Sequence, residues 1–207
     1  MIVTLVEVGK QFTRNWIFRN LSLSISTPQK IAVLGQNGSG KSTLLQILSG
    51  HLSATEGIVQ FSNEGKQIEP DEVFRRISIA APYLELIEEF TLREIVDFHF
   101  RFKKPVLNHS SKEIIELMEL EKAKEKVFKY FSTGMKQRAK LALAILSDVD
   151  LVLIDEPLTN LDKEGGLWYR KMVEEYLVKK SVAICSNHNA PEYEFCDQVM
   201  NINDYKN

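Results

Sequence analysis

The first 30 residues show a partial alternation of apolar and polar positions, with the two-residue period of a half-buried strand. Between Leu21 and Ile25 the apolar residues fall on one face and the serines on the other. Residues 57–61 predict a further short strand, and residues 63–65 predict its hairpin turn. The N-terminal part of the chain is therefore expected to consist mainly of strands and turns.

Unbroken apolar runs occupy residues 31–34 and 151–154, and residues 181–185 are apolar after an initial serine. Such runs are typical of strands that are buried on both faces of a parallel sheet. Helical periodicity lies between and after them, over residues 42–49, 135–147 and 164–179. This order of elements predicts an α/β fold with a mainly parallel sheet.

The middle of the chain carries two helix-start signals of the capping-box type. Thr91 is followed three residues later by Glu94, and Ser110 is followed in the same way by Glu113. Apolar residues at helical spacing follow each box. We therefore expect an inserted segment made of helices, residues 84–133, within one domain of 207 residues.

The composition is that of an ordinary globular protein, with 44% hydrophobic and 26% charged residues. The formal net charge of −2 gives no sign of a nucleic-acid binder, and none is expected as a partner. Cys185 and Cys196 lack metal-ligand spacing and are expected to be reduced thiols. No apolar run approaches the ~20 residues that span a bilayer, so any membrane part must come from another chain.

The segment Gly35–Thr43 fits the pattern G-x-x-x-x-G-K-[ST] of a phosphate-binding loop. It lies between a predicted buried strand and a predicted helix, which is the context this loop requires. Lys41 is expected to reach the β- and γ-phosphates of a nucleotide, and the Ser42 hydroxyl to bind Mg²⁺. The residues expected to bind the nucleotide are Gly35, Asn37, Gly38, Ser39, Gly40, Lys41, Ser42 and Thr43.

Two acidic residues end the apolar run 151–154. Asp155 stands at the carboxyl end of this predicted strand, where it can hold Mg²⁺ directly or through water. Glu156 follows and can orient or deprotonate an attacking water. Together with the phosphate loop, this pair predicts nucleotide hydrolysis.

The segment 131–138, Phe-Ser-Thr-Gly-Met-Lys-Gln-Arg, resembles the Leu-Ser-Gly-Gly-Gln signature of the ATP-binding cassette (ABC) ATPases. Small residues at a helix start form an anion site from backbone N–H groups and the helix dipole. In that family the site binds the γ-phosphate held by the other subunit. The resemblance therefore implies that Ser132 and Gly134 bind ATP in trans.

Further landmarks match the family in order along the chain. Asp162 is similar to the residue of its D-loop, which crosses the dimer interface, and His188 is similar to its switch histidine. The residues that the resemblance implies in catalysis are thus Lys41, Glu156 and His188. Phe12 resembles the aromatic residue that stacks on adenine, and Trp16 and Phe12 remain alternatives for this role.

One landmark of the family is missing. Its Q-loop glutamine, which touches magnesium and relays motion to the membrane subunits, has Pro82 or Ala81 in its place. Neither side chain can ligate a metal or hydrogen-bond a water. Tyr83 or Glu85 is a candidate replacement.

The resemblance covers nearly the whole chain and implies an ABC nucleotide-binding domain. Its ATPase core with an antiparallel β subdomain would occupy residues 1–83 and 134–207, and the helical subdomain residues 84–133. ATP and Mg²⁺ are the implied cofactors. A second copy of the chain would complete an ATP-sandwich dimer, and a separate transmembrane permease would place the protein at the cytoplasmic side of the cell membrane.

The short chain and the Thr133 and Met135 variants of the signature favour an exporter-type subunit. Two alternatives stay open. One is a soluble ABC ATPase of a non-transport process, such as translation or DNA repair. The other is a nucleotide-dependent interaction switch with low turnover, which the absent glutamine would suit.

Overall fold

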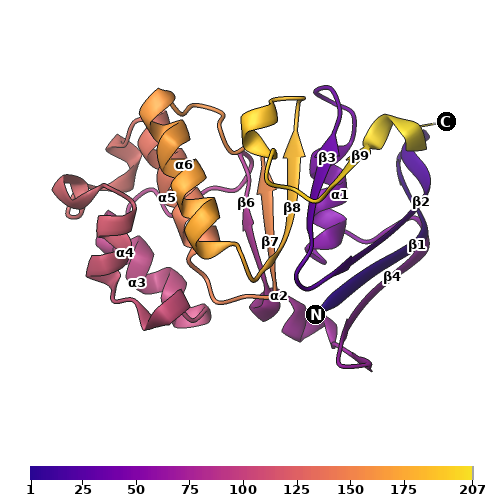
Figure 1. Cartoon of the computed structure of the whole chain (residues 1–207), viewed down its shortest axis with the longest axis horizontal. Helices are drawn as coiled ribbons and strands as arrows, with labels where there is room; N and C mark the ends of the chain where they lie inside the picture. Colours follow the sequence, from indigo (N-terminus) through magenta and orange to yellow (C-terminus); the bar gives the residue numbers. More distant parts are fainter. Residues whose placement is uncertain (207) are drawn as a thin grey trace.

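The computed structural model describes residues 1–206 and contains two sheets with helices around them (Figure 1). The strands are β1 (Ile2–Phe12), β2 (Asn15–Ser26), β3 (Lys30–Leu34), β4 (Glu56–Asn63), β5 (Lys66–Gln67), β6 (Ile77–Ala80), β7 (Leu151–Asp155), β8 (Ser181–Ser186) and β9 (Gln198–Asn201). The α-helices are α1 (Lys41–Leu48), α2 (Pro70–Arg76), α3 (Leu92–Phe102), α4 (Ser111–Leu117), α5 (Thr133–Ile145) and α6 (Lys163–Tyr176). Short 3-10 helices occupy 106–108, 121–123, 128–130, 190–192 and 202–205.

The first sheet is antiparallel, with the order β2-β1-β4-β5. Leu21 and Ile25 are buried and the serines between them are exposed, as the alternation predicted. In β1 the alternation is broken by a bulge, because Glu7 has a positive φ of 50° and the pairing with β2 shifts between Leu5 and Val8. The bulge turns both Leu5 and Val8 into the core.

The second sheet has the order β6-β7-β8-β3-β9, and all its neighbouring strands run parallel. Val152 and Ile154 of β7 pack with the helices α3 to α6, whereas Leu151 and Leu153 pack with α1 and the antiparallel sheet. Both faces of the sheet are therefore buried, which explains the unbroken apolar runs. The predicted α/β class is confirmed.

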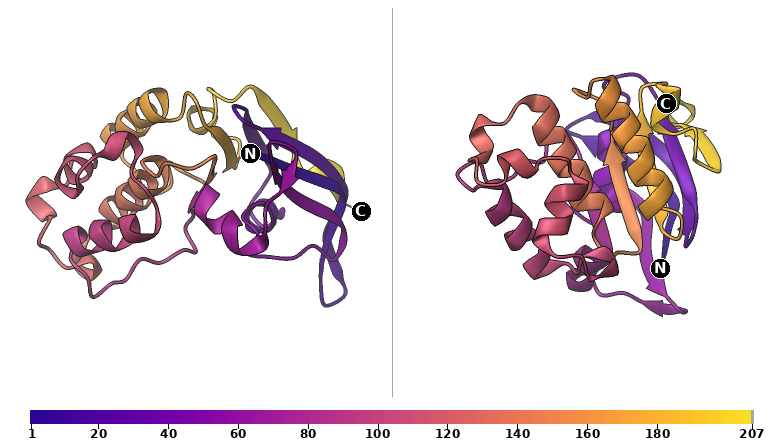
Figure 2. Two further views of the ribbon diagram at one scale, coloured as in Figure 1. Left: turned by 90° about the horizontal axis from the view of Figure 1, so that it is seen from below. Right: turned by 60° about the vertical axis from the view of Figure 1, so that its left-hand side comes forward.

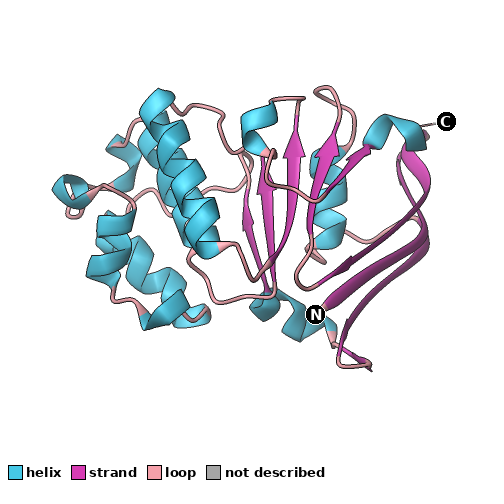
Figure 3. Ribbon diagram, viewed as in Figure 1, coloured by secondary structure: helices cyan, strands magenta, loops and turns pink. Residues whose placement is uncertain are grey.

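Helices α3 to α6 gather on one side of the molecule and the antiparallel sheet lies on the other (Figures 2 and 3). Both predicted capping boxes are present, with the Thr91 and Ser110 side chains accepting from the backbone N–H of Glu94 and Glu113. Within residues 1–206, no helix combines the length and the apolarity that a bilayer crossing needs. The helix α2 and the edge strand β9 are among the elements that were not predicted.

Candidate active site

The phosphate loop connects the end of β3 to the start of α1. Gly38 and Gly40 have positive φ values of 75° and 105°, which side chains other than glycine adopt only with strain. A Cβ atom on Gly40 would lie 2.5 Å from Cγ2 of Ile17, which belongs to β2. Strand β2 of the antiparallel sheet therefore packs directly against the loop. Ile17 is a site residue that was not predicted from the sequence.

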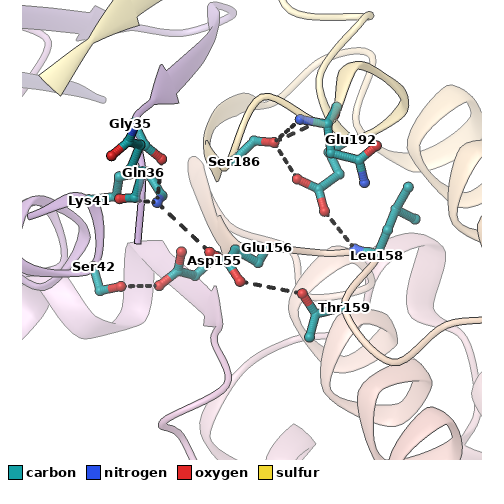
Figure 4. Close-up of polar contacts among 11 residues, drawn as sticks. Gly35, Gln36, Lys41, Ser42, Asp155, Glu156, Leu158, Thr159, Ser186 and Glu192 are labelled. Atoms are coloured by element: carbon teal, nitrogen blue, oxygen red, sulfur yellow. Dashed lines mark hydrogen bonds and ion pairs between the residues drawn. The ribbon is translucent and has the colours of Figure 1, made fainter. Parts of the chain in front are cut away.

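The Lys41 side chain is almost completely buried, with 4% of it exposed. Its Nζ donates hydrogen bonds to the carbonyl oxygens of Gly35 (2.7 Å) and Gln36 (3.2 Å) and lies 3.8 Å from Oε1 of Glu156 (Figure 4). The two carbonyl oxygens carry no charge, and the Glu156 carboxylate lies too far away to form a close ion pair with the buried ammonium. A phosphate oxygen in the loop would be a stronger partner.

Ser42 in the first turn of α1 lies beside Asp155 at the end of β7. The Ser42 hydroxyl donates to Oδ2 of Asp155 at 2.5 Å (Figure 4). Burial raises the pKa of Asp155, and the hydrogen bond from Ser42 partly opposes this effect. A hydroxyl and a buried carboxylate side by side are oxygen donors of the kind that Mg²⁺ prefers.

Glu156 leaves β7 in a left-handed conformation, with φ of 46°. Its N–H donates to the Cys185 carbonyl on the neighbouring strand β8 (2.9 Å), and its Oε2 accepts from the Thr159 hydroxyl (3.4 Å). Its carboxylate thus faces Lys41 and the loop. This conformation places an acidic group at the open side of the phosphate loop.

A cavity of about 260 Å³ lies over the loop. Its lining consists of Ile17, Asn37, Gly38, Ser39, Gly40, Lys41, Ser42, Thr43 and Glu156. Ser39 is buried, and its hydroxyl has no hydrogen-bond partner in the described structure. A buried hydroxyl of this kind is expected to meet a ligand atom. Together with the Lys41 ammonium and the Ser42–Asp155 pair, it fits a magnesium-bound polyphosphate.

The signature segment lies at the N-terminus of α5, outside this cavity. The Ser132 hydroxyl caps the helix by accepting from the Met135 N–H (3.2 Å), and Ser132 is exposed. A Cβ atom on Gly134 would lie 3.0 Å from the carbonyl oxygen of Asn160. Within the described chain, Ser132 and Gly134 do not line the cavity that contains Lys41.

Asp162 and His188 lie on loops that follow β7 and β8. Asp162 caps α6, because its Oδ1 accepts from the Gly165 N–H (2.8 Å). His188 is exposed two residues beyond the end of β8, in a left-handed conformation with φ of 58°. The loops with Asp162 and His188, like Asp155, thus lie at the carboxyl ends of the adjacent parallel strands β7 and β8.

The two candidate adenine-stacking residues differ in how free their rings are. Phe12 is 47% exposed, and the Lys10 ammonium lies 5.0 Å from its ring. The Trp16 ring is covered by the Arg19 guanidinium at 4.1 Å, and Arg19 is held by two hydrogen bonds to Glu56 (2.7 and 2.9 Å). Phe12 therefore has the more accessible face.

The residues at the missing glutamine follow β6. Ala81 is buried and Pro82 is exposed, and the Lys140 ammonium donates to the Pro82 carbonyl (3.4 Å). Burial, followed by the negative charge of Asp155, raises the pKa of Tyr83 to about 12. Tyr83 is therefore a neutral phenol near the candidate metal-binding carboxylate. Glu85 is exposed.

This fold and this site define a phosphate-loop nucleotide hydrolase with an inserted helical segment. A family model described as ABC transporter matches residues 18–159. The chain therefore belongs to the ABC transporter ATP-binding proteins, and it is an ATPase that uses ATP with Mg²⁺.

The comparisons with known proteins agree with this assignment. The chain is 30% identical over 203 residues to the uncharacterized ABC transporter ATP-binding protein YxlF of Bacillus subtilis, covering 96% of this chain and 67% of YxlF. It is 27% identical to the sulfate/thiosulfate import ATP-binding protein CysA of Nitrosomonas europaea, covering 98% of this chain and 58% of CysA. It is 28% identical to the Nod factor export ATP-binding protein I of Bradyrhizobium diazoefficiens, covering 96% of this chain and 66% of that protein.

The fold is similar to that of solved ABC cassettes. A dimeric post-hydrolysis structure of the cassette MJ0796 bound to ADP and Pi superposes with a TM-score of 0.83 at 23% identity, covering 96% of this chain and 93% of that one. At this identity the likeness supports the fold. The family membership is carried by the sequence match over residues 18–159.

Proposed function

We propose that this chain is the exporter-type ATPase subunit of a membrane transporter and that it works as a head-to-tail pair at the cytoplasmic side of the membrane. The observation that carries the proposal is the separation of the signature from the cavity. Ser132 is exposed at the start of α5, while the cavity over Lys41 is lined by other segments. Each half is incomplete in one chain, and a second copy can supply the missing half.

In this proposal each residue has a defined part in hydrolysis. Lys41 exchanges its two loop carbonyls for the β- and γ-phosphates. Ser42 and Asp155 hold Mg²⁺, which when bound neutralises developing charge on the phosphates. Glu156 orients or deprotonates the attacking water, and His188 senses the terminal phosphate. Phe12 stacks on adenine.

The second copy contributes Ser132 and Gly134. The exposed helix start offers backbone N–H groups and a positive dipole end to the γ-phosphate of the partner's ATP. Asp162 belongs to the loop that would lie along the contact between the copies. Loss of the γ-phosphate removes these bridging contacts, so the pair would open after hydrolysis.

An aromatic patch supports a docking role for the helical segment. Phe98 and Phe102 of α3 are 41% and 58% exposed, and Phe98 packs edge-on against both Phe90 and Phe102. Phe74 of α2 is 46% exposed, and the Lys103 ammonium binds its carbonyl. Exposed aromatic clusters of this kind mark protein contacts, and we assign this one to the permease.

The relatives leave the direction of transport open, because importers and exporters both match. The exporter assignment rests on Thr133 and Met135 in the signature. A nucleotide-dependent interaction switch with low turnover is the second candidate function, because Pro82 or Ala81 stands where the family has a glutamine that contacts magnesium. Steady-state phosphate release from the purified chain separates the two candidates, since a switch would hydrolyse ATP only slowly.

Glu156→Gln tests the proposed dimer. The variant keeps the shape of the side chain but cannot act as a base, so it should bind ATP without hydrolysing it and accumulate as a dimer. Size-exclusion chromatography with and without ATP reports this change. Glu194→Gln, at an exposed carboxylate that pairs with Arg170, is the matched control and should behave as wild type. A Glu156→Gln variant that stays monomeric at saturating ATP would contradict the proposal.

A further inference from the structure

A buried carboxylate outside the predicted site lies between two of its loops. Glu192 belongs to the 3-10 helix Ala190–Glu192 and is 3% exposed. Its Oε1 accepts from the Leu158 N–H (3.2 Å), and its Oε2 accepts from the Ser186 hydroxyl (Figure 4). One side chain therefore joins the segment after Glu156 to the end of β8.

The Ser186 side of this contact controls the turn that carries His188. The Ser186 hydroxyl accepts from the Asn189 N–H (3.1 Å), and the Glu192 N–H donates to the Asn189 carbonyl (3.0 Å). Ser186 and Asn189, which flank the His188 turn, are thus bonded to each other, and Ser186 is bonded to the Glu192 carboxylate. His188 itself has a left-handed φ of 58°, which the closed turn stabilises.

The Leu158 side of the contact controls the loop that carries Glu156. Only Pro157 separates Leu158 from Glu156, and the Thr159 hydroxyl donates to the Glu156 carboxylate (3.4 Å). The Tyr169 hydroxyl donates to the Glu192 carbonyl (3.1 Å) and anchors the 3-10 helix to α6. Glu192 is therefore fixed at its backbone and spans both loops with its carboxylate.

We propose that Glu192 is a positioning residue of the hydrolytic site, whose carboxylate holds the Glu156 loop and the His188 turn at a fixed separation. The inference rests on the roles proposed for Glu156 and His188. The function of Glu192 requires its reach and a hydrogen bond at each of its two terminal atoms, while its charge is dispensable. A glutamine can reproduce the contact, because its carbonyl can accept from Leu158 and its amide can donate to Ser186.

Three substitutions separate reach from charge. Glu192→Asp keeps the charge but is one methylene too short to span both partners, and Glu192→Ala removes the contact. Both should lower kcat roughly tenfold and leave the KM for ATP within about twofold, because misplaced groups slow the chemical step. Glu192→Gln should retain kcat within about threefold. Glu194→Gln is the control for a nearby carboxylate that is exposed.

Phosphate release by the full chain is measured at several ATP and protein concentrations, with circular dichroism to verify folding. If Glu192→Ala does not fold, the comparison of kcat between Glu192→Asp and Glu192→Gln tests the inference. The inference is overturned if folded Glu192→Asp turns over as fast as Glu192→Gln, if KM rises with kcat unchanged, or if high protein concentration restores the rate. Turnover that persists in Glu156→Gln would overturn the proposed function itself.

Discussion

Adding one methyl group at Gly40 should destabilise the chain much more than adding one at Gly38. Both glycines lie in the phosphate loop with positive φ, 105° and 75°. A Cβ atom at Gly38 would meet nothing within 4 Å, whereas a Cβ atom at Gly40 would lie 2.5 Å from Cγ2 of Ile17. Gly38→Ala is therefore a matched control that adds the same atom without the clash.

The structure gives the expected size of each effect. At Gly38 the left-handed backbone costs alanine about 1 kcal/mol, and reduced freedom of the unfolded chain offsets roughly half of it. At Gly40 the φ value lies well beyond the left-handed minimum near about 57°, so the backbone term is about 2 kcal/mol. The clash with Ile17 adds about 1–3 kcal/mol. With the same unfolded-chain offset at both positions, we expect a loss of about 2.5–4.5 kcal/mol at Gly40 and under about 1 kcal/mol at Gly38.

Urea unfolding of the nucleotide-free chain, followed by circular dichroism, measures both losses. The double variant Gly40→Ala/Ile17→Ala should lose about 1–3 kcal/mol less stability than the sum of the two single variants, because the clashing Cγ2 is gone. Ile17→Val keeps that atom, so the losses of Gly40→Ala and Ile17→Val should simply add. Equal losses at Gly38 and Gly40, or zero coupling between Gly40 and Ile17, would refute the claim that β2 presses on the loop.

Three further predictions concern pH, adenine and the second copy. Burial lowers the pKa of His99 to about 4, so below pH 6.5 the unfolded chain binds a proton that the folded chain does not. The free energy of unfolding of the chain should fall by up to about 2 kcal/mol from pH 6.5 to 5. His99→Gln should not show this pH-dependent loss in urea titrations. Phe12→Ala should weaken ATP binding about tenfold in calorimetry, whereas Trp16→Ala should change it less than about threefold. Inactive Lys41→Ala and Ser132→Arg chains should regain phosphate release when mixed, since a mixed pair holds one intact site; no recovery would contradict a shared site.

The local parts of the site could be predicted from the sequence because their signals are contiguous. The phosphate loop needs only glycines, a lysine and a hydroxyl residue between a strand and a helix. The predicted capping boxes at Thr91 and Ser110 are confirmed for the same reason, since a cap involves residues three positions apart. Asp155 follows a strand whose unbroken apolar run was visible in the sequence.

The remaining features depend on contacts between distant segments. Ile17 of β2 lies against Gly40, which is more than 20 residues away in the sequence, and no pattern within β2 indicates this contact. The strand β9 is an edge with two exposed residues at Gln198 and Val199, so it lacks the apolar run of the central strands. Glu192 lies in an acidic stretch of the sequence, and only the tertiary structure shows that it is buried.

The strand order explains why β8 has the central position in this site. The phosphate loop follows β3 and Asp155 ends β7, and β8 lies between these two strands. The Ser186 carbonyl accepts from the Gly35 N–H at 3.3 Å, and the Cys185 carbonyl accepts from the Glu156 N–H at 2.9 Å. The phosphate-binding half and the hydrolytic half are therefore both hydrogen-bonded to the last two residues of β8. Since the His188 turn begins directly after these residues, we expect a displacement of that turn to act on both halves through the backbone of one strand.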